Sequence, residues 1–124
     1  MDNQKITTFT DLNAWKQGHR LALEVYRLTS SFPKEELYSL VDQLRRAAVS
    51  ITSNIAEGFS RQSYKEKVQF YSTAMGSATE VQSQLLLARD LGYINTEQFN
   101  QISEIELTAH KLLSGLIKSS KSRI

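Results

Sequence analysis

The sequence predicts an all-α protein, and within that class an antiparallel up-down-up-down four-helix bundle. Its 124 residues include one Pro and five Gly, so helix breakers are few. Apolar residues recur at spacings of three and four in four segments. Short turns join these segments, and short links leave neighbouring helices antiparallel. A chain of this length forms one domain. We therefore expect a flexible arm over residues 1–9, the bundle over 10–118 and a flexible basic tail over 119–124.

The first helix is expected over residues 11–31, with Thr10 as its N-terminal cap. Its apolar side holds Leu12, Trp15, Ala22, Val25, Tyr26, Leu28 and Thr29. Another side carries a basic stripe of Lys16, Arg20 and Arg27, interrupted only by Glu24. A solvated face is the simpler interpretation of this stripe.

The second helix is expected to start at Pro33, because proline suits the first helical position and disfavours helix in the residue before it. Its apolar series is Leu37, Leu40, Val41, Leu44, Ala48, Ile51 and Ile55. Gly58 follows the last of these and predicts a left-handed cap that ends the helix.

The segment from Ala47 to Ala56 carries no charge on any side. Its surface away from the core holds Ser50, Ser53 and Asn54, where a water-facing helix normally has Lys, Glu or Arg. Small uncharged residues all round indicate protein on both sides, either a second helix or a second subunit. We therefore expect the protein to form an oligomer.

Capping patterns predict where the third and fourth helices begin. Ser63 and Glu66 form a capping box at the start of the third, which Gly92 ends, and Asn95 with Gln98 caps the fourth. The apolar series are Val68, Tyr71, Ala74, Met75, Ala78, Val81, Leu85, Ala88 and Leu91, and then Phe99, Ile102, Ile105, Ala109, Leu112, Leu113, Leu116 and Ile117.

The second and third helices are expected to share polar contacts. Folding the chain at residues 60–61 places Ser50 near Tyr71, and Arg46 near Glu80 as a candidate ion pair. Gly76 costs about 1 kcal/mol relative to Ala inside a helix. Close helix approach, or room for a neighbour's side chain, would explain it. A polar network tying the two helices together is the structural interpretation, and a ligand site is the alternative.

The residue inventory argues against several classes of function. No cysteine is present, which excludes disulfides and thiolate metal sites. No signal peptide or membrane-length apolar run is found, so we expect a cytoplasmic protein with no membrane partner. We expect no enzyme activity, cofactor or metal. His19 and His110 lie on different helices, and Glu106 with His110 is too little for a di-metal site.

Several motifs resemble one protein family. They are Phe9-x-Asp11-Leu12-x-x-Trp15, Phe32-Pro33-x-Glu35-Glu36, the run from Gln43 to Gly58, Gly76-Ser77-x-x-Glu80 and Leu91-Gly92-Tyr93. They resemble, over residues 9–117, the bacterial four-helix bundle proteins encoded in intervening sequences of 23S rRNA genes, also called S23 ribosomal proteins.

The resemblance implies a homopentamer. It also implies kinship with the accessory variability protein of diversity-generating retroelements, a basic pentameric barrel that binds nucleic acid and a reverse transcriptase. The family's motif residues, which we expect to form a structural polar network or interface, are here Arg46, Ser50, Asn54, Glu57, Gly76, Ser77 and Glu80.

Two functions remain open. The first is a non-catalytic oligomer that binds RNA or DNA, because a net charge of +2 per chain becomes about +10 on a pentamer. Candidate contacts are Lys16, Arg20, Arg27, Arg45, Arg61, Lys65 and Lys67, with Lys118, Lys121 and Arg123 in the tail. The second is a scaffold that binds a partner protein without nucleic acid. Against the first, 13 acidic residues nearly balance 15 basic ones, so the cations could merely solvate the bundle.

Overall fold

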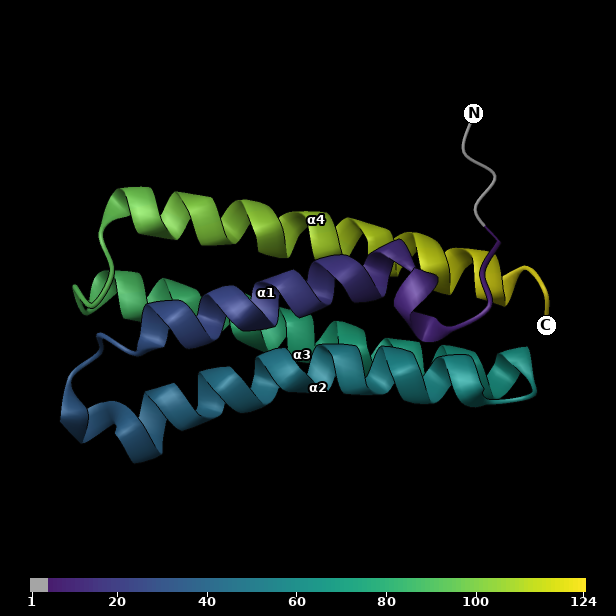
Figure 1. The fold of residues 1–124 in the computed structure, drawn as a ribbon, viewed down its shortest axis with the longest axis horizontal. Coiled ribbons are helices and arrows are strands. Elements are labelled where there is room, and N and C mark those ends of the chain that lie inside the picture. Colours follow the sequence, from purple (N-terminus) through teal and green to yellow (C-terminus); the bar gives the residue numbers. More distant parts are fainter. Residues whose placement is uncertain (1–4) are drawn as a thin grey trace.

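The computed structural model describes residues 5–124, which form four α-helices packed side by side as a bundle (Figure 1). The helices are α1 (Asn13–Thr29), α2 (Asp42–Ser60), α3 (Tyr64–Asp90) and α4 (Thr96–Lys121). Each packs against its neighbours in the cyclic order α1, α2, α3, α4. The predicted fold class is confirmed. The start of α1, the end of α4 and the α2–α3 turn lie at one end, which we call the terminal end, and the other two connections lie at the opposite end (Figure 1).

One continuous apolar core runs along the bundle, and all four helices contribute to it. Its least exposed members include Leu21 and Val25 of α1, Leu44 and Ile55 of α2, Val81 and Leu85 of α3, and Leu113 of α4. These are positions at helical spacing, so the periodicity of the sequence locates the core. Three residues of the predicted apolar series are exposed instead: Tyr26 (47%), Leu37 (46%) and Leu91 (49%). The Tyr26 ring lies beneath the Arg45 guanidinium.

The first helix begins later than predicted. Thr8, rather than Thr10, caps a short 3-10 helix (Phe9–Asp11), and α1 then starts at Asn13 without a side-chain cap. Asp11 is the reason, because its carboxylate accepts hydrogen bonds from the backbone of Thr7 (2.9 Å) and Thr8 (3.0 Å). These bonds lower the pKa of Asp11. Residues 1–4 of the expected arm lie outside the described part of the chain, and the flexibility of the arm stays a prediction.

The second helix is not one continuous element from Pro33. A 3-10 helix (Lys34–Glu36) and a π-helix (Leu37–Val41) precede α2, and the backbone at Tyr38 and Ser39 is non-helical. Contacts of Glu36 accompany this break. Tyr93 donates a 2.7 Å hydrogen bond to the Glu36 carboxylate, which also accepts from the backbone N–H of Leu40.

Gly58 does not end α2, which continues to Ser60, so the prediction of a left-handed cap there is wrong. A Cβ on Gly58 would lie 2.7 Å from the Tyr71 ring and 3.0 Å from the Cβ of Phe70. Glycine is therefore needed for close packing of α2 on α3. The later turn also shifts the predicted register, so that Ser50 meets Ser77 instead of Tyr71.

The remaining helix ends agree with the sequence patterns. Ser63 accepts a hydrogen bond from the backbone of Glu66, and Asn95 and Gln98 form a reciprocal capping box. Gly92, just after α3, has φ of 79°, the left-handed conformation that favours glycine. Helix α4 runs on to Lys121, so it includes the first residues of the expected tail, 119–121. Across the described residues, no helix has the length and apolarity needed to span a membrane.

Candidate nucleic-acid interface

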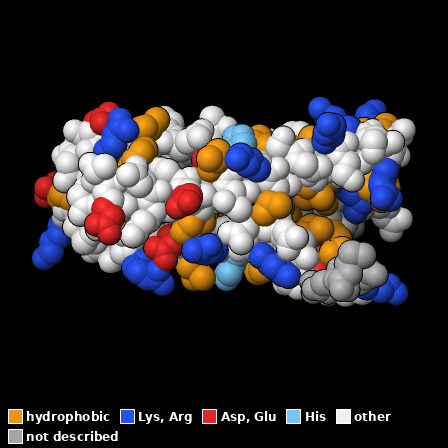
Figure 2. Space-filling model, turned by 90° about the horizontal axis from the view of Figure 1, so that it is seen from above, with side chains coloured by type: hydrophobic (Ala, Val, Ile, Leu, Met, Phe, Trp, Pro, Cys, Tyr) orange, Lys and Arg blue, Asp and Glu red, His pale blue; other side chains and the backbone are white. Residues whose placement is uncertain are grey.

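Charge is divided between the two ends of the bundle. The halves of the helices nearer the terminal end, residues 5–20, 52–77 and 109–124, hold ten Lys or Arg and three Asp or Glu. The remaining described residues, 21–51 and 78–108, hold five Lys or Arg and nine Asp or Glu. Figure 2 shows the same division on one face, with acidic side chains gathered toward the opposite end. The terminal end is therefore strongly basic although the whole chain is nearly balanced.

The α2–α3 turn and the first turn of α3 supply three of these cations, and their surroundings differ. Arg61 lies 3.2 Å from the Glu57 carboxylate and 4.5 Å from the centre of the Phe70 ring. Lys67 donates a 2.6 Å hydrogen bond to the carbonyl of Phe59, so it caps the C-terminus of α2. Lys65 is exposed and forms no salt bridge with any described residue. Of the three, Lys65 is the most available to a ligand.

Helix α4 brings three more cations to the same end, from a distant part of the sequence. Lys118 and Lys121 occupy its last turn and are exposed. Arg123 donates a weak 3.4 Å hydrogen bond to the Tyr64 hydroxyl, and its guanidinium lies 5.6 Å from the centre of the Tyr64 ring. The fold thus joins the tail to the α2–α3 turn.

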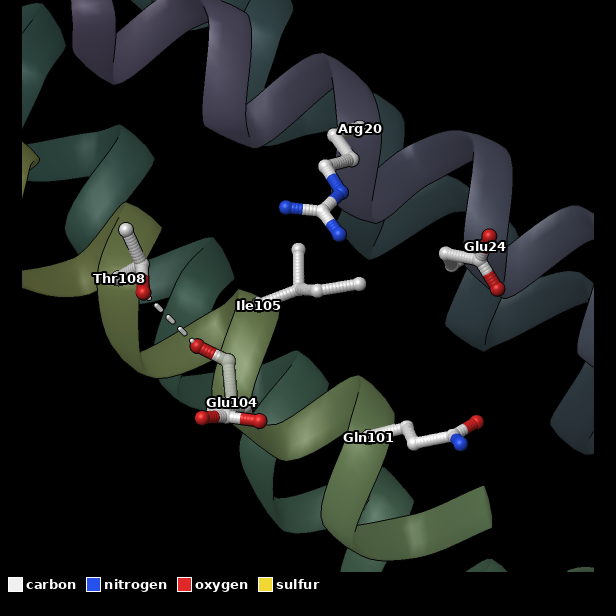
Figure 3. Close-up of a pocket in the computed structure, with 6 residues that line it drawn as sticks. All are labelled: Arg20, Glu24, Gln101, Glu104, Ile105 and Thr108. Atoms are coloured by element: carbon white, nitrogen blue, oxygen red, sulfur yellow. Dashed lines mark hydrogen bonds between the residues drawn. The ribbon is translucent and has the colours of Figure 1, made fainter.

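The basic stripe of the first helix is divided between the two halves. Lys16 and Arg20 are exposed in the terminal half, whereas Arg27, in the opposite half, pairs with Glu24. Arg20 and Glu24 also line a hollow of about 460 Å³ between α1 and α4, together with Gln101, Glu104, Ile105 and Thr108 (Figure 3). This hollow does not favour an anion, because two carboxylates line it and only one cation.

Arg45 joins α1 to α2. Its Nε donates a 2.9 Å hydrogen bond to the Thr29 hydroxyl, and its guanidinium lies 4.6 Å from the centre of the Tyr26 ring. Loss of Arg45 would disturb the packing of these helices. A nucleic-acid contact by Arg45 stays a prediction, as it does for the other cations named from the sequence.

The structure brings three of the predicted network residues together between α2 and α3. Ser50 and Ser77 share a 2.8 Å hydrogen bond, and the Asn54 amide donates to the Ser50 hydroxyl at 3.0 Å. This bridge accounts for part of the uncharged surface of α2. Ser53 remains exposed beside it.

The other members of that set lie apart from this bridge. The predicted Arg46–Glu80 ion pair is not formed, and the Arg46 side chain is 80% exposed. Arg46 instead lies 3.3 Å from Asp42, and Glu80 accepts a 3.1 Å hydrogen bond from Gln84. Glu57 pairs with Arg61, as described above. Gly76 is exposed, and a Cβ there would meet nothing within 4 Å, so close approach within this chain does not explain it.

Two features escaped the sequence analysis. The first is a set of aromatic rings among the terminal cations, Phe59, Tyr64 and Phe70. The alternation of aromatic and basic residues from Phe59 to Phe70 could have predicted this set. The second is the burial of Glu106, which the sequence placed beside His110 and which is 1% exposed inside α4. Burial raises the pKa of its carboxyl, against the opposing influence of His110, 3.4 Å away. The spacing of apolar residues does not predict that an acidic side chain is buried.

The bundle also exposes apolar residues on two opposite sides. Between α1 and α2, Leu23, Tyr26 and Val49 are each more than 40% exposed. Leu86 and Leu107 lie on the α3–α4 side, where they line an apolar groove together with Leu85 and Phe99. In the cyclic helix order these two surfaces face away from each other. One chain therefore offers two different surfaces for association.

Comparison with known proteins decides the family. The sequence model of the 23S rRNA-intervening sequence proteins matches residues 10–115. The chain belongs to this family. The resemblance seen in the motifs is thereby confirmed.

A solved structure supports the fold of this family member independently. It is a protein with unknown function from the S23 ribosomal protein family of Bacteroides thetaiotaomicron VPI-5482, with a TM-score of 0.76 and 24% sequence identity. The similarity covers 85% of this chain and 98% of the other. At this level of identity the likeness shows the shared fold. A search of curated proteins finds no significant match.

Proposed function

We propose that this family member is a non-catalytic oligomer that binds nucleic acid, with RNA as the first candidate, through its basic terminal end. The observation that carries the proposal is the division of charge. Ten cations against three acidic residues in one half of the molecule attract a polyanion far more strongly than the whole-chain charge of +2 suggests. RNA comes first because the family is named for an rRNA intervening sequence.

An oligomer would multiply this effect. The two opposite apolar surfaces favour contact of one surface with the other on the next chain, and such contacts close into a ring if the rotation allows it. A cyclic ring repeats each subunit about one axis, so all basic ends would gather on the same rim. Five copies, as the family resemblance implies, would give a rim with a net charge of about +35. Phosphate contacts at that rim would carry affinity without base specificity.

The test is RNA binding by fluorescence anisotropy across a salt series. The informative variant is Lys65→Ala with Lys118→Ala and Lys121→Ala, because these side chains are exposed and form no described salt bridge. Lys65 also lies in the first turn of α3, where a cation is mildly unfavourable. Arg61 is a poorer choice, since its loss would also uncover Phe70. Lys34→Ala, an exposed cation at the opposite end, is the matched control.

We expect the triple variant to bind more weakly than wild type and to depend less steeply on salt, because fewer counterions are released. The Lys34 control should bind as wild type does. Equal binding by wild type and the triple variant would move the site elsewhere, with Lys16 and Arg20 next to be tested. Light scattering on the same samples measures the oligomer. A monomer at micromolar concentration would contradict the ring.

The second candidate is a scaffold that binds a partner protein. The apolar groove between α3 and α4, with a volume of about 250 Å³, is the observation that favours it. Absence of RNA binding by wild type at low salt, with an intact oligomer, would establish this candidate over the first.

A further inference from the structure

Aromatic rings lie among the cations of the terminal end, and this arrangement points to the kind of nucleic acid that fits there. Arg61 lies over Phe70, and Lys67 lies 5.3 Å from the centre of the Phe59 ring. Tyr64 has two cations beside it, Lys67 at 5.9 Å and Arg123 at 5.6 Å. All three rings are partly exposed. The end therefore combines positive charge with π-surfaces.

The two cations beside Tyr64 differ in how firmly they are held. Tyr64 is the first residue of α3, at the edge of the turn. Lys67 cannot readily leave, because the Phe59 carbonyl holds it at 2.6 Å. Arg123 is held only by the 3.4 Å bond to the Tyr64 hydroxyl, and it is exposed near the chain end. Arg123 can therefore move aside, release one side of the ring and bind a phosphate instead.

An aromatic ring in a basic site distinguishes single strands from duplexes. An unpaired base can stack on the ring while neighbouring phosphates contact Lys and Arg, as in proteins that bind single strands without sequence preference. In a duplex the bases stack on each other, so no base face is open to the ring, and the protein contacts mainly phosphates and 2′-hydroxyls. Charge alone would bind both forms, whereas charge with an accessible ring favours the single strand.

We propose that the terminal end prefers single-stranded over double-stranded RNA, and that Tyr64 is the residue on which a base stacks. This inference rests on the proposed function, because it concerns the same basic end. It adds a contact that depends on base accessibility to the phosphate contacts of Lys65, Lys118 and Lys121. Phe59 and Phe70 support the site by holding Lys67 and Arg61 in place.

The experiment compares one labelled RNA strand of about 20 nucleotides, long enough to fill such a site, with the same strand in a perfect duplex. Binding is measured by anisotropy for wild type, Tyr64→Phe, Tyr64→Leu and Tyr38→Leu. Phe keeps the stacking surface, whereas Leu removes the π-face at similar bulk. Tyr38 is 90% exposed at the opposite end, so Tyr38→Leu controls for loss of an exposed tyrosine. Thermal melting by circular dichroism checks that each variant is folded.

We expect wild type, Tyr64→Phe and Tyr38→Leu to bind the single strand about tenfold more tightly than the duplex, a ratio typical of one stacked base. Tyr64→Leu should lose that preference while its duplex affinity changes little. Equal affinity of wild type for both forms would overturn the inference and leave the proposed function intact. So would a Tyr64→Leu variant that loses both affinities equally, since the ring would then act by holding cations. Failure of wild type to bind either form overturns both proposals.

Discussion

Two glycines in this chain should respond oppositely to the same substitution. In Gly58→Ala the new Cβ would lie 2.7 Å and 2.8 Å from two atoms of the Tyr71 ring. Tyr71 is 2% exposed, so the ring has little room to move. Overpacking of this kind costs about 1–3 kcal/mol, against a gain in helix propensity of at most about 1 kcal/mol. We expect a net loss of about 1–2 kcal/mol in the free energy of unfolding.

Gly76→Ala is the matched control, because a Cβ there meets nothing within 4 Å. It should stabilise the fold by up to about 1 kcal/mol through helix propensity alone. For a chain of this size each kcal/mol moves Tm by roughly 3–6 °C. Gly58→Ala should therefore melt about 5 °C below wild type, and Gly76→Ala a few degrees above it. Thermal melting by circular dichroism, with urea titration as a second probe, gives both values.

Both variants must be compared at one protein concentration, because association would make Tm depend on it. A Gly58→Ala protein as stable as wild type would refute the close approach of α2 and α3 at Tyr71. A destabilised Gly76→Ala with a smaller oligomer mass would instead place Gly76 in a subunit contact.

Three further predictions concern other contacts of α2 and α3. Ser50→Leu should lower the free energy of unfolding by about 1–3 kcal/mol, because it overfills a small site and removes the partner of Ser77; an unchanged urea midpoint would contradict this. Lys67→Ala should lower it by about 1 kcal/mol through loss of the bond to the Phe59 carbonyl, whereas Lys65→Ala should leave it nearly unchanged in the same titration. Burial raises the pKa of Tyr71 to about 12 from its usual 10.0. As the pH rises, the Tyr71 hydroxyl therefore ionises first in the unfolded chain, and the free energy of unfolding should fall from about pH 10 to pH 12. Melting across that range, with Tyr71→Phe as the variant expected to lose this step, measures the effect.

Local patterns in the sequence predicted local structure well. The caps at Ser63 and Asn95 and the end of α3 before Gly92 were confirmed, because each depends on residues within four positions of one another. Most core positions of the four helices were predicted for the same reason, although the series for the first helix lacked Leu21, which is 0% exposed. A spacing of three and four is enough to place a residue on the inner side of a helix.

The roles of Gly58 and Gly76 could not be separated in this way. Both are helical glycines, and only the helix register shows which one faces a partner. The predicted register was wrong because Gly58 was interpreted as the end of α2.

The clustering of cations at the terminal end could not be predicted from a sequence pattern either. Lys65 and Lys121 are far apart in the chain, and the fold brings their helix ends together. Acidic residues are spread along the sequence, yet most fall in the opposite half once the helices are assembled. The net charge of the chain therefore understated the positive charge at the terminal end.

The α2–α3 hairpin has a kinetic consequence. Its turn contains three residues, 61–63, and is closed by nearby contacts such as those of Lys67 with Phe59 and of Gly58 with Tyr71. Short loops close fast, so we expect this hairpin to form in the folding transition state before α1 and α4 dock. Gly58→Ala should then chiefly slow folding, whereas truncation of Leu113 in α4 should chiefly speed unfolding. Stopped-flow folding and unfolding rates would show whether the chain assembles outward from this turn.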